Sequence, residues 1–208
     1  MTIDQRFFIN EILDSLIDKH SFLLQSRLQA IIKRTEKNYC NATIYDYIVE
    51  ALCDSEFFKK DTFLTEKEFI ISNIKSSISF HKEINLIIPI FSRKPLSPIK
   101  NSGVNPDLGE INSLLRFHSL AKLITNLSEV QCNFIILSDG HKYKRACLTP
   151  KYIVDNYQRA LRYWIRELSL SDYVKFFDYE EWIQKDKDHN WLNIREELYK
   201  SKNIKKFQ

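Results

Sequence analysis

The chain has 208 residues, of which 44% are hydrophobic and 13% aromatic, and its formal net charge is +4. That length is enough for one well-packed domain, and the composition excludes an intrinsically disordered chain. We find no run of about eighteen uncharged apolar residues, so we expect no membrane span. The N-terminal residues lack the basic start and apolar block of a signal peptide, and we predict a cytoplasmic protein.

The cysteines and histidines do not indicate a metal site or a disulfide framework. The four cysteines stand far apart, at Cys40, Cys53, Cys132 and Cys147. Disulfide and zinc patterns need closer spacing, so we expect reduced thiols in a cytosolic protein.

Lysines gather at the C-terminal end, residues 200–206. A solvated tail explains them, and we do not expect nucleic acid as a partner, although contact with a phosphate backbone is the alternative.

The first 83 residues are predicted to be helical. Apolar residues recur at intervals of three and four over residues 7–32, which predicts an amphipathic helix, and a second helix is predicted over 44–52. A third begins at Thr65, whose hydroxyl and the carboxylate of Glu68 form a capping box.

The rest of the chain alternates between strands and helices. Residues 84–90 form a short apolar run that predicts a buried strand, with Pro89 placing its end near the edge of a sheet. The elements predicted after it are a helix over 107–127, a strand over 134–137, a helix over 150–166, a strand over 174–177, and helices near 179–186 and 190–201. This order predicts an α/β fold with a Rossmann-like, largely parallel sheet flanked by helices and a helical N-terminal region.

We therefore expect a single α/β domain over residues 1–208. It comprises a helical N-terminal region over 1–83, a core over 84–180, and C-terminal helices with the basic tail over 181–208. All three glycines and four of the five prolines lie between residues 89 and 140. Both residue types mark irregular backbone, and ligands bind beyond the carboxyl ends of parallel strands. We expect the loops after the first two strands to share one rim.

Three polar clusters lie between residues 91 and 141. The first is the loop 91–103, in which Arg93, Lys94 and Lys100 accompany several hydroxyl and amide donors. Such a loop suits a phosphate or carboxylate ligand, and an ordinary solvated connection is the alternative.

The second cluster is Pro106-Asp107-Leu108-Gly109-Glu110. Asp107 and Glu110 have the spacing of an N-cap and its capping box, which is a purely structural interpretation. Gly109 in the first helical turn costs about 1 kcal/mol relative to alanine, which suggests a close approach by another group. Two carboxylates at one helix start favour an ammonium group over a phosphate.

The third cluster is Ser138-Asp139-Gly140-His141, at the end of the second strand. An Asp-Gly pair between apolar runs is typical of a tight hairpin turn. At the end of a buried strand of a parallel sheet, the same residues present a hydroxyl, a carboxylate and an imidazole to the rim.

Taken in order, the clusters resemble those of the isocyanide synthases, the pyoverdine/dityrosine biosynthesis family. The matching positions are Phe91, Lys94, Lys100, Gly103, Pro106, Asp107, Glu110, Ser138, Asp139 and Gly140, with Tyr157 and Leu161 in the following helix. The resemblance covers roughly residues 84–180. The chain is similar to a short member of the family that lacks the usual C-terminal portion.

The resemblance implies an enzyme of carbon–nitrogen bond-forming transferase or lyase chemistry in secondary metabolism. It joins the α-amine of an amino acid, of tyrosine or tryptophan type, to ribulose 5-phosphate and forms an isonitrile without a metal or organic cofactor. We expect Lys94, Asp107 and Glu110 to be catalytic. The residues expected to bind substrate are Arg93, Lys100, Ser138, Asp139 and His141. A homodimer, a related enzyme acting on another amine or carbonyl substrate, and a non-catalytic ligand-binding domain stay open.

Overall fold

A computed structural model describes residues 3–54, 57, 67–89, 105–143, 149–179 and 181–182. The N-terminal region is helical, as predicted: α1 (Ile3–Asn38), α2 (Ile44–Leu52) and α3 (Lys67–His81). No glycine or proline occurs before Pro89, which explains why α1 continues beyond its predicted end. The α2 helix has its predicted bounds. Thr65, the predicted cap of the third helix, lies outside the described residues.

Within the described residues the sheet has three strands, β1 (Ile84–Ile88), β2 (Cys132–Ser138) and β3 (Val174–Asp178), in the order β1-β2-β3. Both strand pairs are parallel, which confirms the predicted α/β fold class with its parallel sheet. β1 lies at an edge and ends before Pro89, which has no N–H to donate to the ladder.

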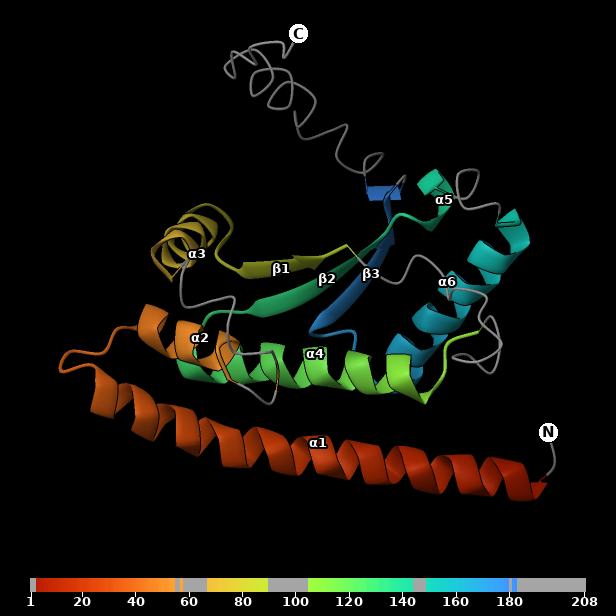
Figure 1. The fold of residues 1–208 in the computed structure, drawn as a ribbon, viewed down its shortest axis with the longest axis horizontal. Coiled ribbons are helices and arrows are strands. Elements are labelled where there is room, and N and C mark those ends of the chain that lie inside the picture. Colours follow the sequence, from red (N-terminus) through yellow and green to blue (C-terminus); the bar gives the residue numbers. More distant parts are fainter. Residues whose placement is uncertain are drawn as a thin grey trace, which may run out of the picture.

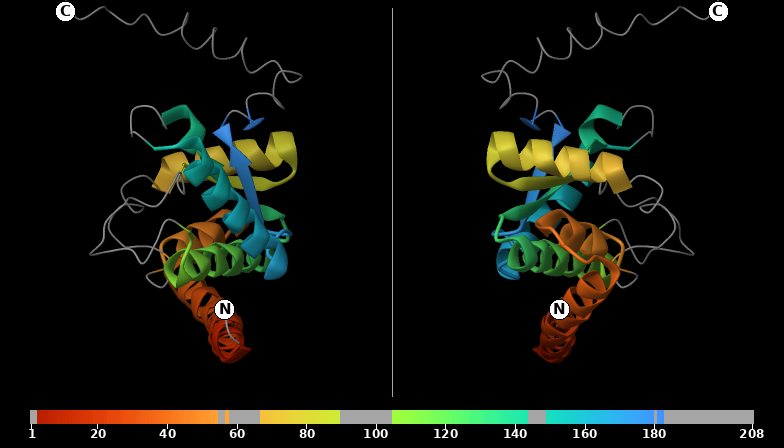
Figure 2. Two further views of the ribbon diagram at one scale, coloured as in Figure 1. Left: turned by 90° about the vertical axis from the view of Figure 1, so that its right-hand side faces the viewer. Right: turned by 90° about the vertical axis from the view of Figure 1, so that its left-hand side faces the viewer.

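In the part of the core that the structure describes, the helices are α4 (Leu108–Ser128), α5 (Gly140–Tyr143) and α6 (Lys151–Glu167). Figures 1 and 2 show α4 between the sheet and α1, with α2 beside it, α3 near β1 and α6 near β3. β2 passes directly into the single turn of α5. Because parallel strands flank β2 on both sides, the Asp139–Gly140 pair does not form a hairpin turn, and that interpretation of the third cluster is wrong.

Two groups of buried apolar side chains hold these layers together. One joins α1, α2 and α4 to the sheet through Ile31, Ile48, Leu120 and Phe134. The other joins α4 and α6 to the sheet; its fully buried members include Leu114, Ile136, Tyr157, Leu161 and Val174. Phe117 of α4 stacks on Phe134 with ring centroids 5.0 Å apart and touches both groups.

Buried charges in the N-terminal region are paired. Asp54 is fully buried, and its carboxylate lies 2.9 Å from the Arg27 guanidinium and 3.4 Å from that of Arg34. Cys53 and Cys132 are buried free thiols, and burial raises the pKa of Cys132 to about 12. Such a thiol is a packing group, not a nucleophile. None of the helices in the described part of the chain combines the length and apolar character needed to cross a bilayer.

Candidate active site

The start of α4 carries the predicted capping box. Asp107 has extended backbone, and its Oδ1 accepts a hydrogen bond from the Gly109 N–H at 2.8 Å. In return, Glu110 Oε2 accepts from the Asp107 N–H at 2.9 Å. A Cβ at position 109 would lie 3.1 Å from Asp107 Oδ1. Gly109 therefore has a local role, because it leaves room for the carboxylate that caps the helix.

The other oxygen of Glu110 connects α4 to α6. Glu110 Oε1 accepts from the Tyr157 hydroxyl at 3.2 Å, and Tyr157 is only 1% exposed. Burial raises the pKa of Tyr157, and the negative charges of Glu110 and Asp107 raise it further. The hydroxyl therefore stays protonated and donates to the carboxylate.

A second polar cluster lies where β2 and β3 end. The Nε2 of Gln158 donates to Ser138 Oγ at 3.0 Å and to Asp178 Oδ2 at 2.7 Å. Ser138 and Asp178 face each other across the parallel register, and all three side chains are buried. Buried polar groups cost free energy unless they are hydrogen-bonded, so Gln158 fixes the geometry of both strand ends.

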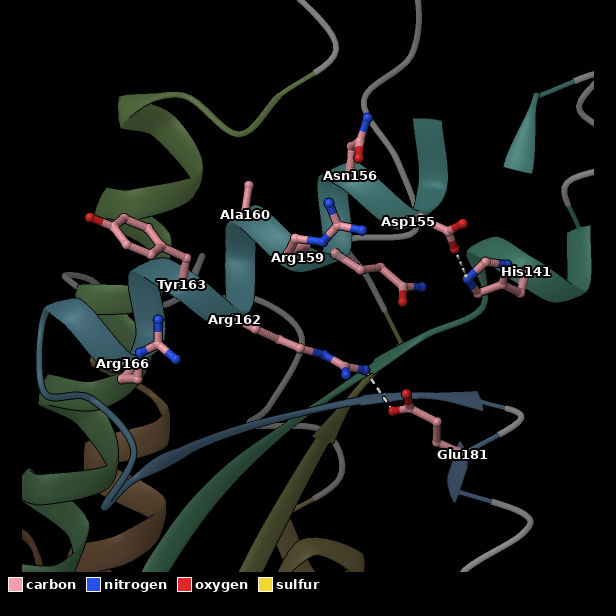
Figure 3. A pocket seen from close by; sticks show the side chains of 10 residues that line it. His141, Asp155, Asn156, Arg159, Ala160, Arg162, Tyr163, Arg166 and Glu181 are labelled. Carbon is pink, nitrogen blue, oxygen red and sulfur yellow. Dashed lines mark hydrogen bonds and ion pairs between the residues drawn. The ribbon is translucent and has the colours of Figure 1, made fainter. Parts of the chain in front are cut away.

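The third polar group of the rim comes from α5 and α6. The His141 Nε2 lies 3.0 Å from Asp155 Oδ1. Both residues line a cavity of about 750 Å³ along α6, which we call the α6 cavity; Figure 3 shows the side chains around it. Its other charged lining groups are Arg159, Arg162, Arg166 and Glu181. A cavity of this size is typical of small-molecule sites.

The structure brings five of the predicted site residues to one rim of the molecule. Asp107 and Glu110 lie at the start of α4, Ser138 ends β2, Asp139 is half-buried directly after it, and His141 follows in α5. The helix α6 connects them, because its consecutive residues Tyr157 and Gln158 bond to Glu110 and to Ser138. Arg93, Lys94 and Lys100 lie outside the described residues.

Sequence reasoning missed Gln158, Asp178 and Asp155. Asp178 could have been found, because it ends a predicted strand of the same parallel sheet and so belongs to the same rim. Gln158 and Asp155 gave no such signal, since polar residues on a helix usually face solvent. The described residues contain no group of three or more His, Cys, Asp or Glu side chains placed to bind a metal ion.

The fold and this rim define an α/β protein with a polar site at the carboxyl ends of its parallel strands. Residues 74–208 match the family described as pyoverdine/dityrosine biosynthesis protein. The chain belongs to this family, which confirms the family resemblance predicted from the sequence. The match includes all of the rim residues described above.

A solved structure shares the fold. The crystal structure of the PvcA protein from Pseudomonas aeruginosa superposes with a TM-score of 0.60 at 20% sequence identity, over 76% of this chain. The chain spans about half, 53%, of the length of that protein. No curated protein matches the chain closely enough to serve as a relative.

Proposed function

We propose that this chain is a cytoplasmic enzyme of the isocyanide synthase type. It joins the α-amine of an amino acid, of tyrosine or tryptophan type, to ribulose 5-phosphate and forms an isonitrile. The observation that carries the proposal is the start of α4, inside the family match, where Asp107 and Glu110 place two carboxylates side by side. Paired carboxylates suit an ammonium group that must be bound and then deprotonated.

The two carboxylates have different tasks in this proposal. Glu110 uses one oxygen for the Asp107 N–H and the other for the Tyr157 hydroxyl, so it orients the site and contributes negative charge. Asp107 is the residue we assign to take the proton of the ammonium group. Positioned acid–base groups contribute about 10²–10⁴-fold to a rate.

The first step conserves atoms and charge as follows. Asp107 accepts a proton from the ammonium group, and the freed amine nitrogen attacks the ketone carbon of the pentulose. A carbon–nitrogen bond forms while the carbonyl electron pair moves to oxygen, which is then protonated. Loss of water gives an imine, which completes this step. We assign Lys94 to polarise the ketone, and Arg93 and Lys100 to the sugar phosphate.

The end of β2 is assigned to the sugar hydroxyls. Ser138 is buried and bonded to Gln158, so it acts by fixing the turn that follows it. Asp139 is half-buried and is the group of this pair that we expect to touch the ligand. His141 lines the α6 cavity and belongs to the substrate-binding set.

Mass spectrometry with labelled sugar tests the reaction. The protein is incubated with uniformly ¹³C-labelled ribulose 5-phosphate and unlabelled amino acids, with heat-denatured protein as the control for spontaneous glycation. We expect an amino-acid product that carries one labelled carbon. A product with all five labelled carbons would instead support a related enzyme that condenses an amine with a carbonyl compound. No product above the control would contradict both.

A further inference from the structure

The outer face of α6 carries three arginines that the proposed reaction does not use. Arg159, Arg162 and Arg166 are spaced by three and four residues, so they lie on one side of the helix. Their Cα atoms are spread over about 10 Å of helix axis. All three line the α6 cavity, together with His141, Asp155 and Glu181.

The acidic groups of the α6 cavity are engaged in pairs with specific partners. The Arg162 guanidinium lies 2.6 Å from Glu181, and His141 lies 3.0 Å from Asp155. Figure 3 shows both pairs as dashed lines, and none reaches Arg159 or Arg166. Among the residues that the structure describes, no carboxylate forms an ion pair with these two arginines.

The charges of the cavity therefore do not balance. Three guanidinium groups and two carboxylates line the cavity, which leaves one excess positive charge. Arg166 lies in the last turn of α6, where the helix dipole favours a cation without any ligand. Arg159 lies in the middle of the helix, where that explanation does not apply. It stands one turn before Arg162, within reach of a shared anion.

The remaining lining groups suit a small polar ligand. Arginine binds phosphate oxygens through a planar fork of N–H donors. Asn156 and Tyr163 add an amide and a phenol at the cavity wall. The pair of Arg162 and Glu181 is about half exposed, at 42% and 48%, so an incoming anion can replace Glu181 at little cost. Gln158 forms part of the wall and bonds to the ends of β2 and β3, which places an occupant beside the rim.

We propose that the α6 cavity binds the phosphate group of a small phosphorylated ligand, with Arg159, Arg162 and Arg166 as its cations. The acidic residues Asp155 and Glu181 among the arginines favour a small molecule over a nucleic acid strand, which needs a continuous basic track. The inference does not depend on the proposed reaction, because phosphate binding is measured without turnover.

The test compares two double variants of the whole chain. R159Q/R166Q removes two charges from the cavity, and K33Q/K37Q removes two charges from exposed positions of α1. Binding of inorganic phosphate and of ribulose 5-phosphate is followed by NMR titration at constant ionic strength. We expect R159Q/R166Q to weaken phosphate binding at least tenfold while K33Q/K37Q leaves it unchanged. The conservative variant R159K/R166K should fall between wild type and R159Q/R166Q, because it keeps charge but loses the fork.

The two ligands distinguish the source of the phosphate. Parallel losses for inorganic phosphate and ribulose 5-phosphate would assign the phosphate of the sugar substrate to the α6 cavity in place of Arg93 and Lys100. A loss for inorganic phosphate alone would assign it to a different phosphorylated ligand and still support the proposal. Equal affinities in wild type and R159Q/R166Q would overturn it. The proposal would also be overturned if the protein bound no inorganic phosphate but bound oligonucleotides through these arginines, with an affinity that falls as salt is added.

Discussion

Two helices of this molecule, α2 and α4, each begin with a capping box, but the carboxylates of the two boxes have different partners. At α2 the N-cap is the hydroxyl residue Thr43, and Asp46 Oδ2 accepts from its N–H at 3.0 Å and from its hydroxyl at 2.7 Å. The Lys67 ammonium reaches the other oxygen at 3.2 Å. Burial opposes ionisation of Asp46, but the hydrogen bonds from Thr43 and Lys67 lower its pKa.

At α4 both positions of the box are carboxylates. Asp107 replaces the hydroxyl residue as N-cap, and the second oxygen of Glu110 accepts from the neutral hydroxyl of Tyr157. The α2 box shows that one acid and one hydroxyl suffice to start a helix. We infer that the second acid at α4 serves a ligand, and that charge rather than capping geometry separates the two helix starts.

Among the variants proposed here, the one that removes the charge of Asp107 should have the largest effect, a loss of turnover. Asparagine is as good an N-cap as aspartate, so Asp107→Asn should leave the melting temperature within about 2 °C of wild type. We expect isonitrile formation to fall at least about 100-fold. Asp46→Asn is the matched control, and it should keep full turnover. Wild-type turnover in Asp107→Asn would remove the functional distinction between the two boxes.

Removing the Tyr157 hydroxyl tests how much its hydrogen bond to Glu110 stabilises the fold. Tyr157→Phe removes this donor from an oxygen of the half-buried Glu110 and should lower the free energy of unfolding by about 1–2 kcal/mol. Tyr152→Phe on the same helix is the control, because Tyr152 is 65% exposed. Chemical denaturation measures the free energy of unfolding of both variants. Equal stabilities of wild type and Tyr157→Phe would show that the hydrogen bond between α4 and α6 contributes nothing to stability.

Removing the Lys67 ammonium should have the smallest effect. Lys67→Met is expected to lower stability by about 0.5–1 kcal/mol at neutral pH. Because the folded-state pKa of Asp46 lies below its usual 3.8, the ionised carboxylate stabilises the fold above that pH, and this is lost as the pH falls through the folded-state pKa.

The stability difference between wild type and Lys67→Met should thus be constant near neutrality and shrink in acid. Denaturation curves across this pH range measure it. Lys75→Met, on the same helix, removes an ammonium that lies over the Tyr45 ring, and its effect should not change with acid. A difference for Lys67→Met that is independent of pH would mean that Lys67 does not stabilise the Asp46 charge.

The features that the sequence predicted well depend on short-range patterns. The bounds of α2 and the capping box of α4 follow from apolar periodicity and from side chains three residues apart. The strands were visible as apolar runs, and their alternation with helices predicted parallel pairing. The burial of Ser138 was not predictable, because it depends on the packing of Gln158 from twenty residues further along the chain.

The rim shows what sequence alone leaves out. Tyr157 and Gln158 are neighbours in the chain, yet they bond to groups on α4 and on two strands. Only the packing of α6 against the sheet determines which polar residues of that helix face inward. The arginine face of α6 is different, since the spacing of Arg159, Arg162 and Arg166 can be recognised in the sequence. Its cavity requires the position of α5 and the end of β3.

Binding of an ammonium group at the start of α4 can be measured by titration with amino acids. Tyrosine and tryptophan are each compared with the analogue that lacks only the α-amine. We expect the wild type and Asp46→Asn to bind the amino acids and not the deaminated analogues. Asp107→Asn should lose that preference. Equal binding of amino acid and deaminated analogue by the wild type, or an unchanged preference in Asp107→Asn, would show that Asp107 does not bind the α-amine.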